Sequence, residues 1–178
     1  MDYIIRKANP DDREAIELLI EESARGLSQE DYSERQIESA IRAVFGVDTD
    51  LIVDGTYFVA DNSGMLVGCG GWSKRRTLLG GDRFASRDSS ELDPKVEAAK
   101  IRAFFVHPKY ARRGLGRALL SLCESEARDN GFRSIELMAT LPGLKLYRAC
   151  GYEGSERVEY EIGEGASIEF VPMRKELR

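Results

Sequence analysis

The sequence has few of the residues that build disulfide frameworks, metal sites or membrane spans. Its 178 residues include three cysteines, Cys69, Cys123 and Cys150, and a single histidine, His107. Because the cysteine count is odd and the spacing suits no metal, we expect reduced thiols that fill the core, and no metal site. No apolar run approaches the roughly 18 residues that a membrane helix needs, and no leader-like segment opens the chain. We therefore predict a cytoplasmic protein without a membrane partner.

Long basic runs are also missing, and the net charge of −5 argues against a nucleic-acid partner. Acidic residues, in turn, are missing between Ala98 and Cys123. The basic residues of that segment are Lys100, Arg102, Lys109, Arg112, Arg113 and Arg117. A basic segment in an acidic protein predicts a small anionic ligand bound there.

The pattern of apolar residues and turn signals predicts one domain over residues 1–178. Strands are expected at residues 3–7, 56–60, 65–72, 98–106, 134–139, 152–162 and 167–173. Helices are expected after residues 9–10, after residue 33, over residues 115–130 and over residues 142–150. Strands and helices alternate in the centre, and hairpins lie at the ends. The fold class is therefore α/β, with a mixed, mostly antiparallel central sheet flanked by helices.

In three segments the hydrophobic pattern of a helix or strand is absent or interrupted. We expect residues 46–55 to form a loop in which residues 51–53 lie against the core. Gly68, Gly70 and Gly71 interrupt a strand, which indicates a bulge or a close approach by another backbone or a ligand. Residues 73–97 form a long polar loop. We interpret this loop as functional, and the alternative is a mobile surface excursion.

Residues Arg112–Arg117 read RRGLGR and open the helix that follows the fourth strand. The first N–H groups of a helix are free and carry partial positive charge, which suits phosphate oxygens. Glycine lets the backbone approach a ligand closely, and arginine adds charge. Alone, the glycine pair more often marks a tight turn. It matches neither a Walker loop nor a dinucleotide fingerprint.

The residues around this turn resemble a family motif. The run Phe104-Phe105-Val106-His107-Pro108, then Arg113-Gly114-Leu115-Gly116 and Ala118-Leu119-Leu120, resembles the coenzyme A motif of the GNAT family of N-acetyltransferases. Leu144-Lys145-Leu146-Tyr147-Arg148-Ala149-Cys150-Gly151-Tyr152 resembles that family's downstream motif. The resemblance implies an acyl-CoA N-acyltransferase-like sandwich. It also implies an enzyme that transfers an acetyl group from acetyl-CoA to a small-molecule amine by direct attack.

The resemblance also implies roles for individual residues. The backbone of Phe104 and Val106 would pair with the pantetheine arm, and the N–H near Val106 would polarise the thioester carbonyl. Tyr147 would protonate the leaving thiolate, whereas its alternative role is packing. The implied cofactor-binding residues are Phe104, Phe105, Val106, Arg112, Arg113, Gly114, Leu115, Gly116 and Arg117.

Because of one departure from the family, the sequence does not identify the general base. Lys100 stands where many members carry a glutamate that relays the amine proton. Glu97, Asp93 and Glu136 are candidates, and a chain of waters is another. Because Lys100 replaces this glutamate, a second possible function is that of a non-catalytic acyl-CoA sensor. A third possible function is that of a generic phosphate binder.

The sequence indicates less about the acceptor amine than about the acetyl donor. Strand alternation predicts that Arg102, Phe104 and Val106 share a face, so that Arg102 could bind a carboxylate on the acceptor. The loop arginines Arg75, Arg76 and Arg83 offer the same chemistry, although a solvated charged loop explains them equally well. The resemblance also allows a homodimer through the C-terminal strands.

Overall fold

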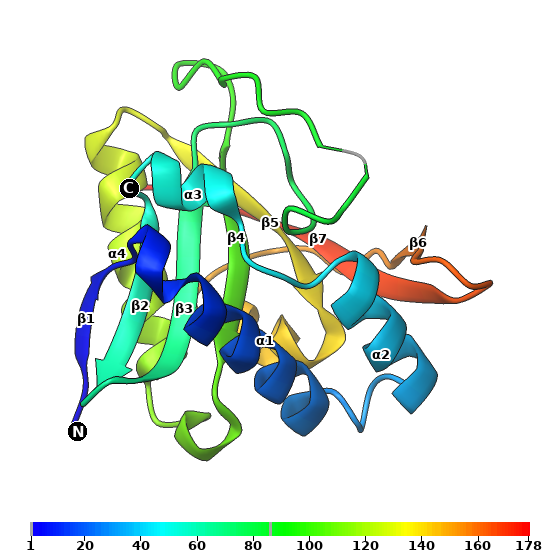
Figure 1. Ribbon diagram of the computed structural model, residues 1–178. Coiled ribbons are helices and arrows are strands. Elements are labelled where there is room, and N and C mark those ends of the chain that lie inside the picture. The colour runs from blue at the N-terminus through cyan, green and yellow to red at the C-terminus, as the bar shows by residue number, and fades with distance from the viewer. Residues whose placement is uncertain (1, 86) are drawn as a thin grey trace.

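A seven-stranded sheet organises the fold of this computed structural model, which describes residues 2–85 and 87–178. The strands are β1 (Ile4–Lys7), β2 (Tyr57–Asn62), β3 (Met65–Ser73), β4 (Ala99–Val106), β5 (Ser134–Thr140), β6 (Val158–Glu161) and β7 (Ser167–Glu176). Their order in the sheet is β1-β2-β3-β4-β5-β7-β6 (Figure 1). Only the β4–β5 pair is parallel among these described strands. The predicted mixed, mostly antiparallel sheet is confirmed.

Helices cover both faces of the sheet. They are α1 (Arg13–Leu27), α2 (Glu34–Ala43), α3 (Thr49–Val53), α4 (Leu115–Asp129) and α5 (Leu144–Ala149), with 3-10 turns η1 (Pro10–Asp12), η2 (Pro108–Tyr110) and η3 (Leu141–Gly143). The predicted helix starts are confirmed, because Asn9 and Ser33 each close a capping box. Among the described residues, no helix combines the length and the apolar character needed to cross a membrane.

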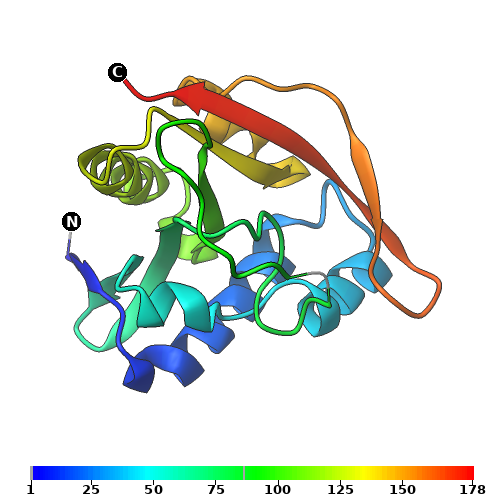
Figure 2. The same ribbon diagram turned by 90° about the horizontal axis from the view of Figure 1, so that it is seen from above.

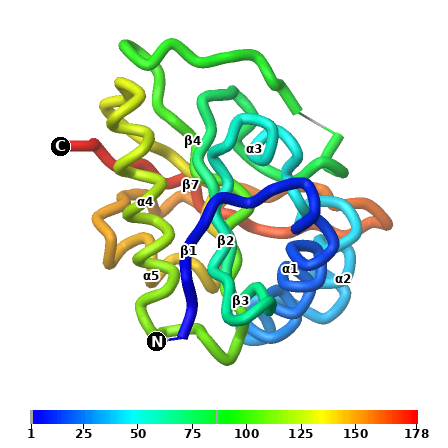
Figure 3. Tube along the Cα trace, turned by 60° about the vertical axis from the view of Figure 1, so that its left-hand side comes forward, coloured from blue at the N-terminus to red at the C-terminus, as the bar shows by residue number. Residues whose placement is uncertain are grey.

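The two faces of the sheet bury two separate apolar clusters. In Figure 3, α4 and α5 lie on one side of the sheet, and α1 and α2 lie on the other. Alternation along β2 follows this division: Tyr57 and Val59 join the cluster under α1 and α2, whereas Phe58 and Ala60 join the cluster under α4. A pleated strand sends successive side chains to opposite faces, so a strand buried on both sides reads as an unbroken apolar run.

The C-terminal hairpin extends the sheet beyond β5. In Figure 2, β6 and β7 reach past β5 toward α2. Gln36 of α2 donates a hydrogen bond from Nε2 to the carbonyl of Ser167, at 2.9 Å. The Tyr32 hydroxyl donates to the carbonyl of Glu169 at 2.6 Å and accepts from the Leu141 N–H at 2.9 Å. The α1–α2 connection is therefore tied to the ends of β5 and β7.

Two expectations for local structure were wrong. Residues 46–55 are not an irregular loop, because they contain α3. This five-residue helix is too short to show a helical period. Leu51 is fully buried as expected, but Val53 is 75% exposed. The expected strand over residues 152–162 begins only at Val158, and residues 154–157 have no regular structure.

A bulge in β4 confirms the interpretation of the glycines in β3. The register slips between Cys69 and Gly71, so that Gly70 faces both Ala103 and Phe104. Ala103 has a φ of +51°, in the left-handed region. A Cβ atom on Gly70 would lie 2.3 Å from Cδ2 of Phe104. The glycine is therefore needed to seat the Phe104 ring against β3.

We expect the substitution Gly70→Ala to destabilise the fold by about 1–3 kcal/mol, because the new methyl group must displace the Phe104 ring. Thermal and urea unfolding measure this loss. Gly46→Ala is the matched control, since its Cβ would lie 3.7 Å from Glu17 Oε1, which is ordinary contact. Equal stability of the two variants would show that Phe104 is not held by this contact.

Candidate active site

The turn before α4 presents free backbone N–H groups. Gly114 has a φ of +87°, and no atom lies within 4 Å of the position of a Cβ on it. The first hydrogen bond of the helix runs from the Ala118 N–H to the Gly114 carbonyl, at 3.0 Å. The N–H groups of Leu115, Gly116 and Arg117 precede that bond and have no partner within the helix. This open, positively polarised turn has the features of an anion cradle.

Side chains around the turn are arranged for backbone contact with a ligand. Leu115 is buried and anchors the helix to β3, where a Cβ on Gly68 would lie 2.9 Å from its Cδ2. A Cβ on Gly116 would lie 2.9 Å from Cδ2 of Leu146, so α5 packs closely on the turn. Arg112 and Arg113 are exposed. The predicted cradle thus combines backbone donors with exposed guanidinium groups at its rim.

β4 and β5 separate beside this turn. Among the described residues, they pair at Ala99 with Ile135 and at Lys100 with Glu136 alone. β5 then continues as a partner of β7 up to Thr140, whereas β4 has no β5 partner beyond Lys100. The backbone of β4 from residue 101 to 106 therefore offers hydrogen-bonding groups toward the gap, and an extended ligand can use them like an added strand.

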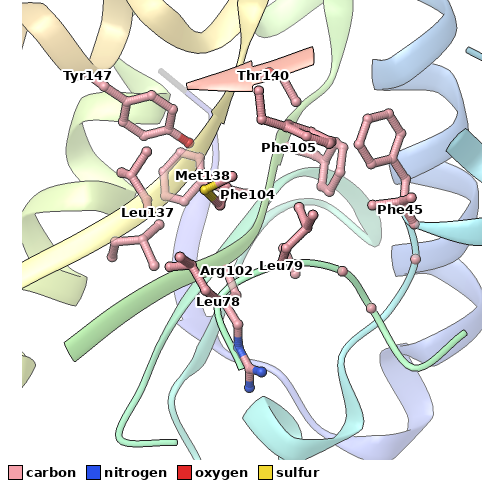
Figure 4. Close-up of a pocket in the computed structure, with 17 residues that line it drawn as sticks. Phe45, Leu78, Leu79, Arg102, Phe104, Phe105, Leu137, Met138, Thr140 and Tyr147 are labelled. Atoms are coloured by element: carbon pink, nitrogen blue, oxygen red, sulfur yellow. The ribbon is translucent and has the colours of Figure 1, made fainter. Parts of the chain in front are cut away.

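A pocket occupies this gap (Figure 4). Phe104 and Leu137 line it from the α4 side of the sheet, and Phe45 and Phe105 line it from the α1 side. The pocket therefore reaches both faces of the sheet. Val106 does not line it among the described residues, and instead packs with the α4-side cluster.

Tyr147 projects from α5 into the pocket, where Figure 4 shows its hydroxyl directed toward Phe104 and Met138. Its ring makes edge-to-face contacts with Phe104 at 6.2 Å and with Tyr152 at 5.8 Å between centroids. Burial raises the pKa of Tyr147 above its usual value of 10.0, so the phenol is protonated at neutral pH. A buried phenol in this state can donate a proton.

Phe104 and Val106 share a face as predicted, but Arg102 does not, because the bulge at Ala103 inserts one residue and reverses the alternation. The guanidinium of Arg102 lies on the α3 side and points away from Tyr147 (Figure 4). There its Nε lies 3.3 Å from Asp48 Oδ2.

Asp48 is fully buried and also contacts Arg87 Nη2 at 3.0 Å. Burial raises the pKa of Asp48, and the charges of Arg102 and Arg87 oppose that rise. The role of Asp48 was not predicted from the sequence. Its only signal is a single acid after the apolar run that ends at Val47.

None of the three candidate general bases lines the pocket among the described residues. Glu136 forms an ion pair with Lys100, and Glu97 forms one with Arg76. Asp93 Oδ1 accepts a hydrogen bond from the Lys95 N–H at 2.9 Å. These carboxylates are occupied by other partners, and the geometry therefore favours none of them as the base.

The remaining loop arginines are also engaged. Arg75 forms a forked pair with Asp54, at 2.7 and 2.6 Å. Arg83 lies 3.2 Å from Glu17. Together with the Arg76–Glu97 pair, these contacts favour the interpretation of a charged loop that is neutralised by its own neighbours.

Comparison with known proteins agrees with this geometry. The model of the acetyltransferase (GNAT) family matches residues 14–152. The chain belongs to the GNAT family. An aminoglycoside N(6')-acetyltransferase type 1 of Stenotrophomonas maltophilia is 33% identical over 63 residues, which span 34% of this chain and 41% of that relative. The match to this curated relative therefore covers less than half of its length.

Two solved structures share the fold of this GNAT chain. A GCN5-related N-acetyltransferase from Rhodopseudomonas palustris has a TM-score of 0.74 at 21% identity, covering 99% of this chain and 97% of that one. The PaiA N-acetyltransferase from Thermoplasma acidophilum, in complex with coenzyme A, has a TM-score of 0.66 at 18% identity and covers 99% of each chain.

The buried pair of Asp48 and Arg102 gives a testable prediction. Arg102→Met leaves Asp48 with Arg87 alone, and we expect a loss of about 3 kcal/mol in unfolding free energy near neutral pH. Without Arg102 the pKa of Asp48 rises further in the folded state, which then holds a proton that the unfolded state releases. The loss should therefore be larger at about pH 8 than at about pH 5.

Urea unfolding at both pH values measures this difference. The double variant Asp48→Asn, Arg102→Met is the control, because it removes the unpaired charge and should regain part of the stability and lose the pH dependence. A loss that does not change with pH would contradict the buried-carboxylate explanation.

Proposed function

We propose that this GNAT protein, as one domain over residues 1–178, transfers the acetyl group of acetyl-CoA to a small-molecule amine. One observation carries the proposal: a single pocket contains Tyr147 and also borders the β4 backbone that β5 leaves unpaired. The donor would lie on the α4 side, with its pyrophosphate on the N–H groups of residues 112–117 and its pantetheine arm along Phe104 to Val106. The relative in complex with coenzyme A supports this choice of cosubstrate.

The chemistry needs few groups from the protein. The amine attacks the thioester carbon directly, a C–N bond forms, and the C–S bond breaks. An N–H of β4 near Val106 polarises the carbonyl, and Tyr147 donates its proton to the departing thiolate. The amine loses its proton to solvent water, which returns one to Tyr147.

An acyl-enzyme is not required. Cys69 and Cys123 are buried, and burial raises the pKa of both thiols, in Cys69 to about 12. Cys150 is partly exposed rather than core filler, and it does not line the pocket among the described residues. The unpaired state of all three is consistent with the predicted cytoplasmic location.

A homodimer remains a prediction, whereas the pairing of the arginines does not favour the predicted carboxylate on the acceptor. A carboxylate would require one of the arginines Arg75, Arg76, Arg83 or Arg102 to leave its present acidic partner.

Replacement of Tyr147 tests the proposed acid. We expect Tyr147→Phe to lower kcat about 100-fold while acetyl-CoA binding is retained, because only the proton donor is lost. Steady-state kinetics and calorimetry measure the two effects. Since burial raises the pKa of Tyr147, wild-type kcat should not fall through ionisation of this phenol below about pH 10.

Tyr152→Phe is the matched control, because Tyr152 packs on the Tyr147 ring but does not line the pocket among the described residues. Equal activity of Tyr147→Phe and Tyr152→Phe would remove Tyr147 from the mechanism.

The donor cradle is tested separately at Gly114. An alanine there must adopt a φ of +87°, which costs about 1–2 kcal/mol and distorts the turn. We expect Gly114→Ala to raise the KM for acetyl-CoA about tenfold with little change in kcat. Gly163 has a φ of +88° and equally open surroundings at the β6–β7 turn. Gly163→Ala should therefore show similar backbone strain with an unchanged KM for acetyl-CoA. A similar rise of this KM in both variants would argue against the cradle.

A further inference from the structure

The part of the pocket on the α1 side, opposite the proposed donor site, is lined by apolar side chains. Phe45 and Phe105 meet edge to face at 5.4 Å between centroids. Leu79, Met138 and Phe170 complete this wall, and Figure 4 shows Leu79 and Met138 around the same space. We call these five residues the acceptor wall. Burial against aromatic and aliphatic carbon favours an apolar ligand by roughly 25 cal/mol for each Å² removed from water.

Negative charge is missing from the pocket. Among the described residues that line it, none is an aspartate or a glutamate, and Arg102 is the one charged side chain. Its side chain is 1% exposed and is held by Asp48 and, at 3.2 Å, by the Ser73 hydroxyl. An ammonium group buried here would find no carboxylate, and burial of an unpaired charge is costly.

Close backbone contacts hold the acceptor wall in one position. The Gly81 N–H donates to the Val44 carbonyl at 2.8 Å, and a Cβ on Gly81 would lie 2.6 Å from the Gly46 carbonyl oxygen. These contacts fix the long loop, with Leu79, against the segment that carries Phe45. A preformed apolar wall selects ligands by shape and by the cost of burying their polar groups.

We propose that the acceptor is a monoamine on a compact apolar body, aromatic or branched aliphatic, which lies against the acceptor wall with its amine directed toward Tyr147. The inference rests on the proposed acetyl transfer and names its substrate class. A single amine can enter as the free base. A polycation would bury further ammonium groups without counter-ions, and a carboxylate would meet no available cation.

Initial rates of thiol release from acetyl-CoA test this substrate class. The probes are 2-phenylethylamine, isoamylamine, phenylalanine, 1,4-diaminobutane and kanamycin. Phenylalanine differs from 2-phenylethylamine only by its carboxylate, and 1,4-diaminobutane carries a second ammonium group. We expect kcat/KM for the two apolar monoamines to exceed the values for the other three by about 100-fold.

Two variants connect that preference to the acceptor wall. Met138→Glu supplies a carboxylate. We expect it to lower the ratio of kcat/KM for 2-phenylethylamine to kcat/KM for 1,4-diaminobutane by about tenfold. Phe45→Leu should raise the KM for 2-phenylethylamine more than the KM for isoamylamine, because it removes an aromatic contact. Its matched control is Phe132→Leu, since Phe132 is equally buried but packs on Trp72 outside the pocket.

The outcomes separate this inference from the proposed function. Preference for kanamycin, 1,4-diaminobutane or phenylalanine would overturn the inference and leave acetyl transfer intact. If Phe45→Leu and Phe132→Leu change the preference for apolar monoamines equally, the acceptor wall does not cause that preference. Absence of turnover with every amine, while calorimetry still detects acetyl-CoA binding, would overturn the proposed function itself.

Discussion

The separation of β4 from β5 is the constraint on which the site depends. Two parallel residue pairs hold the strands together, and the partly buried Lys100–Glu136 ion pair lies at the point where they part. Buried backbone groups need hydrogen-bonding partners. β5 finds them in β7, whereas β4 is left with an open edge. The fold thus leaves an open strand edge in the middle of its sheet, with which an extended ligand can pair.

The bulge at Ala103 determines which side chains meet in that place. It allows Phe104 to face Tyr147 while the adjacent Phe105 faces Phe45, and it turns Arg102 toward Asp48. The Tyr57 hydroxyl donates to the Ala103 carbonyl at 3.1 Å. A buried tyrosine on β2 therefore supports the irregular backbone from which Phe104 and Phe105 line the pocket on opposite faces of the sheet.

Features that arise locally could be predicted from the sequence. The capping boxes at Asn9 and Ser33 and the glycine turn before α4 depend on residues within a few positions of each other. The face assigned to Arg102 could not be predicted, because one inserted residue reverses strand parity and the cause lies across the sheet at Gly70. Asp48 was missed for a similar reason, since its partners Arg87 and Arg102 are 39 and 54 residues away.

α1 packs on η2, the 3-10 turn that precedes the glycine turn before α4. A Cβ on Gly26, near the end of α1, would lie 2.3 Å from Cγ of Pro108, and Glu22 Oε2 lies 3.2 Å from His107 Nε2. The same helix also packs on β4, whose residues Phe104 and Phe105 line the pocket, while Pro108 leads into the turn before α4. A shift of α1 toward or away from the sheet would therefore displace β4 and the residues that lead into that turn together.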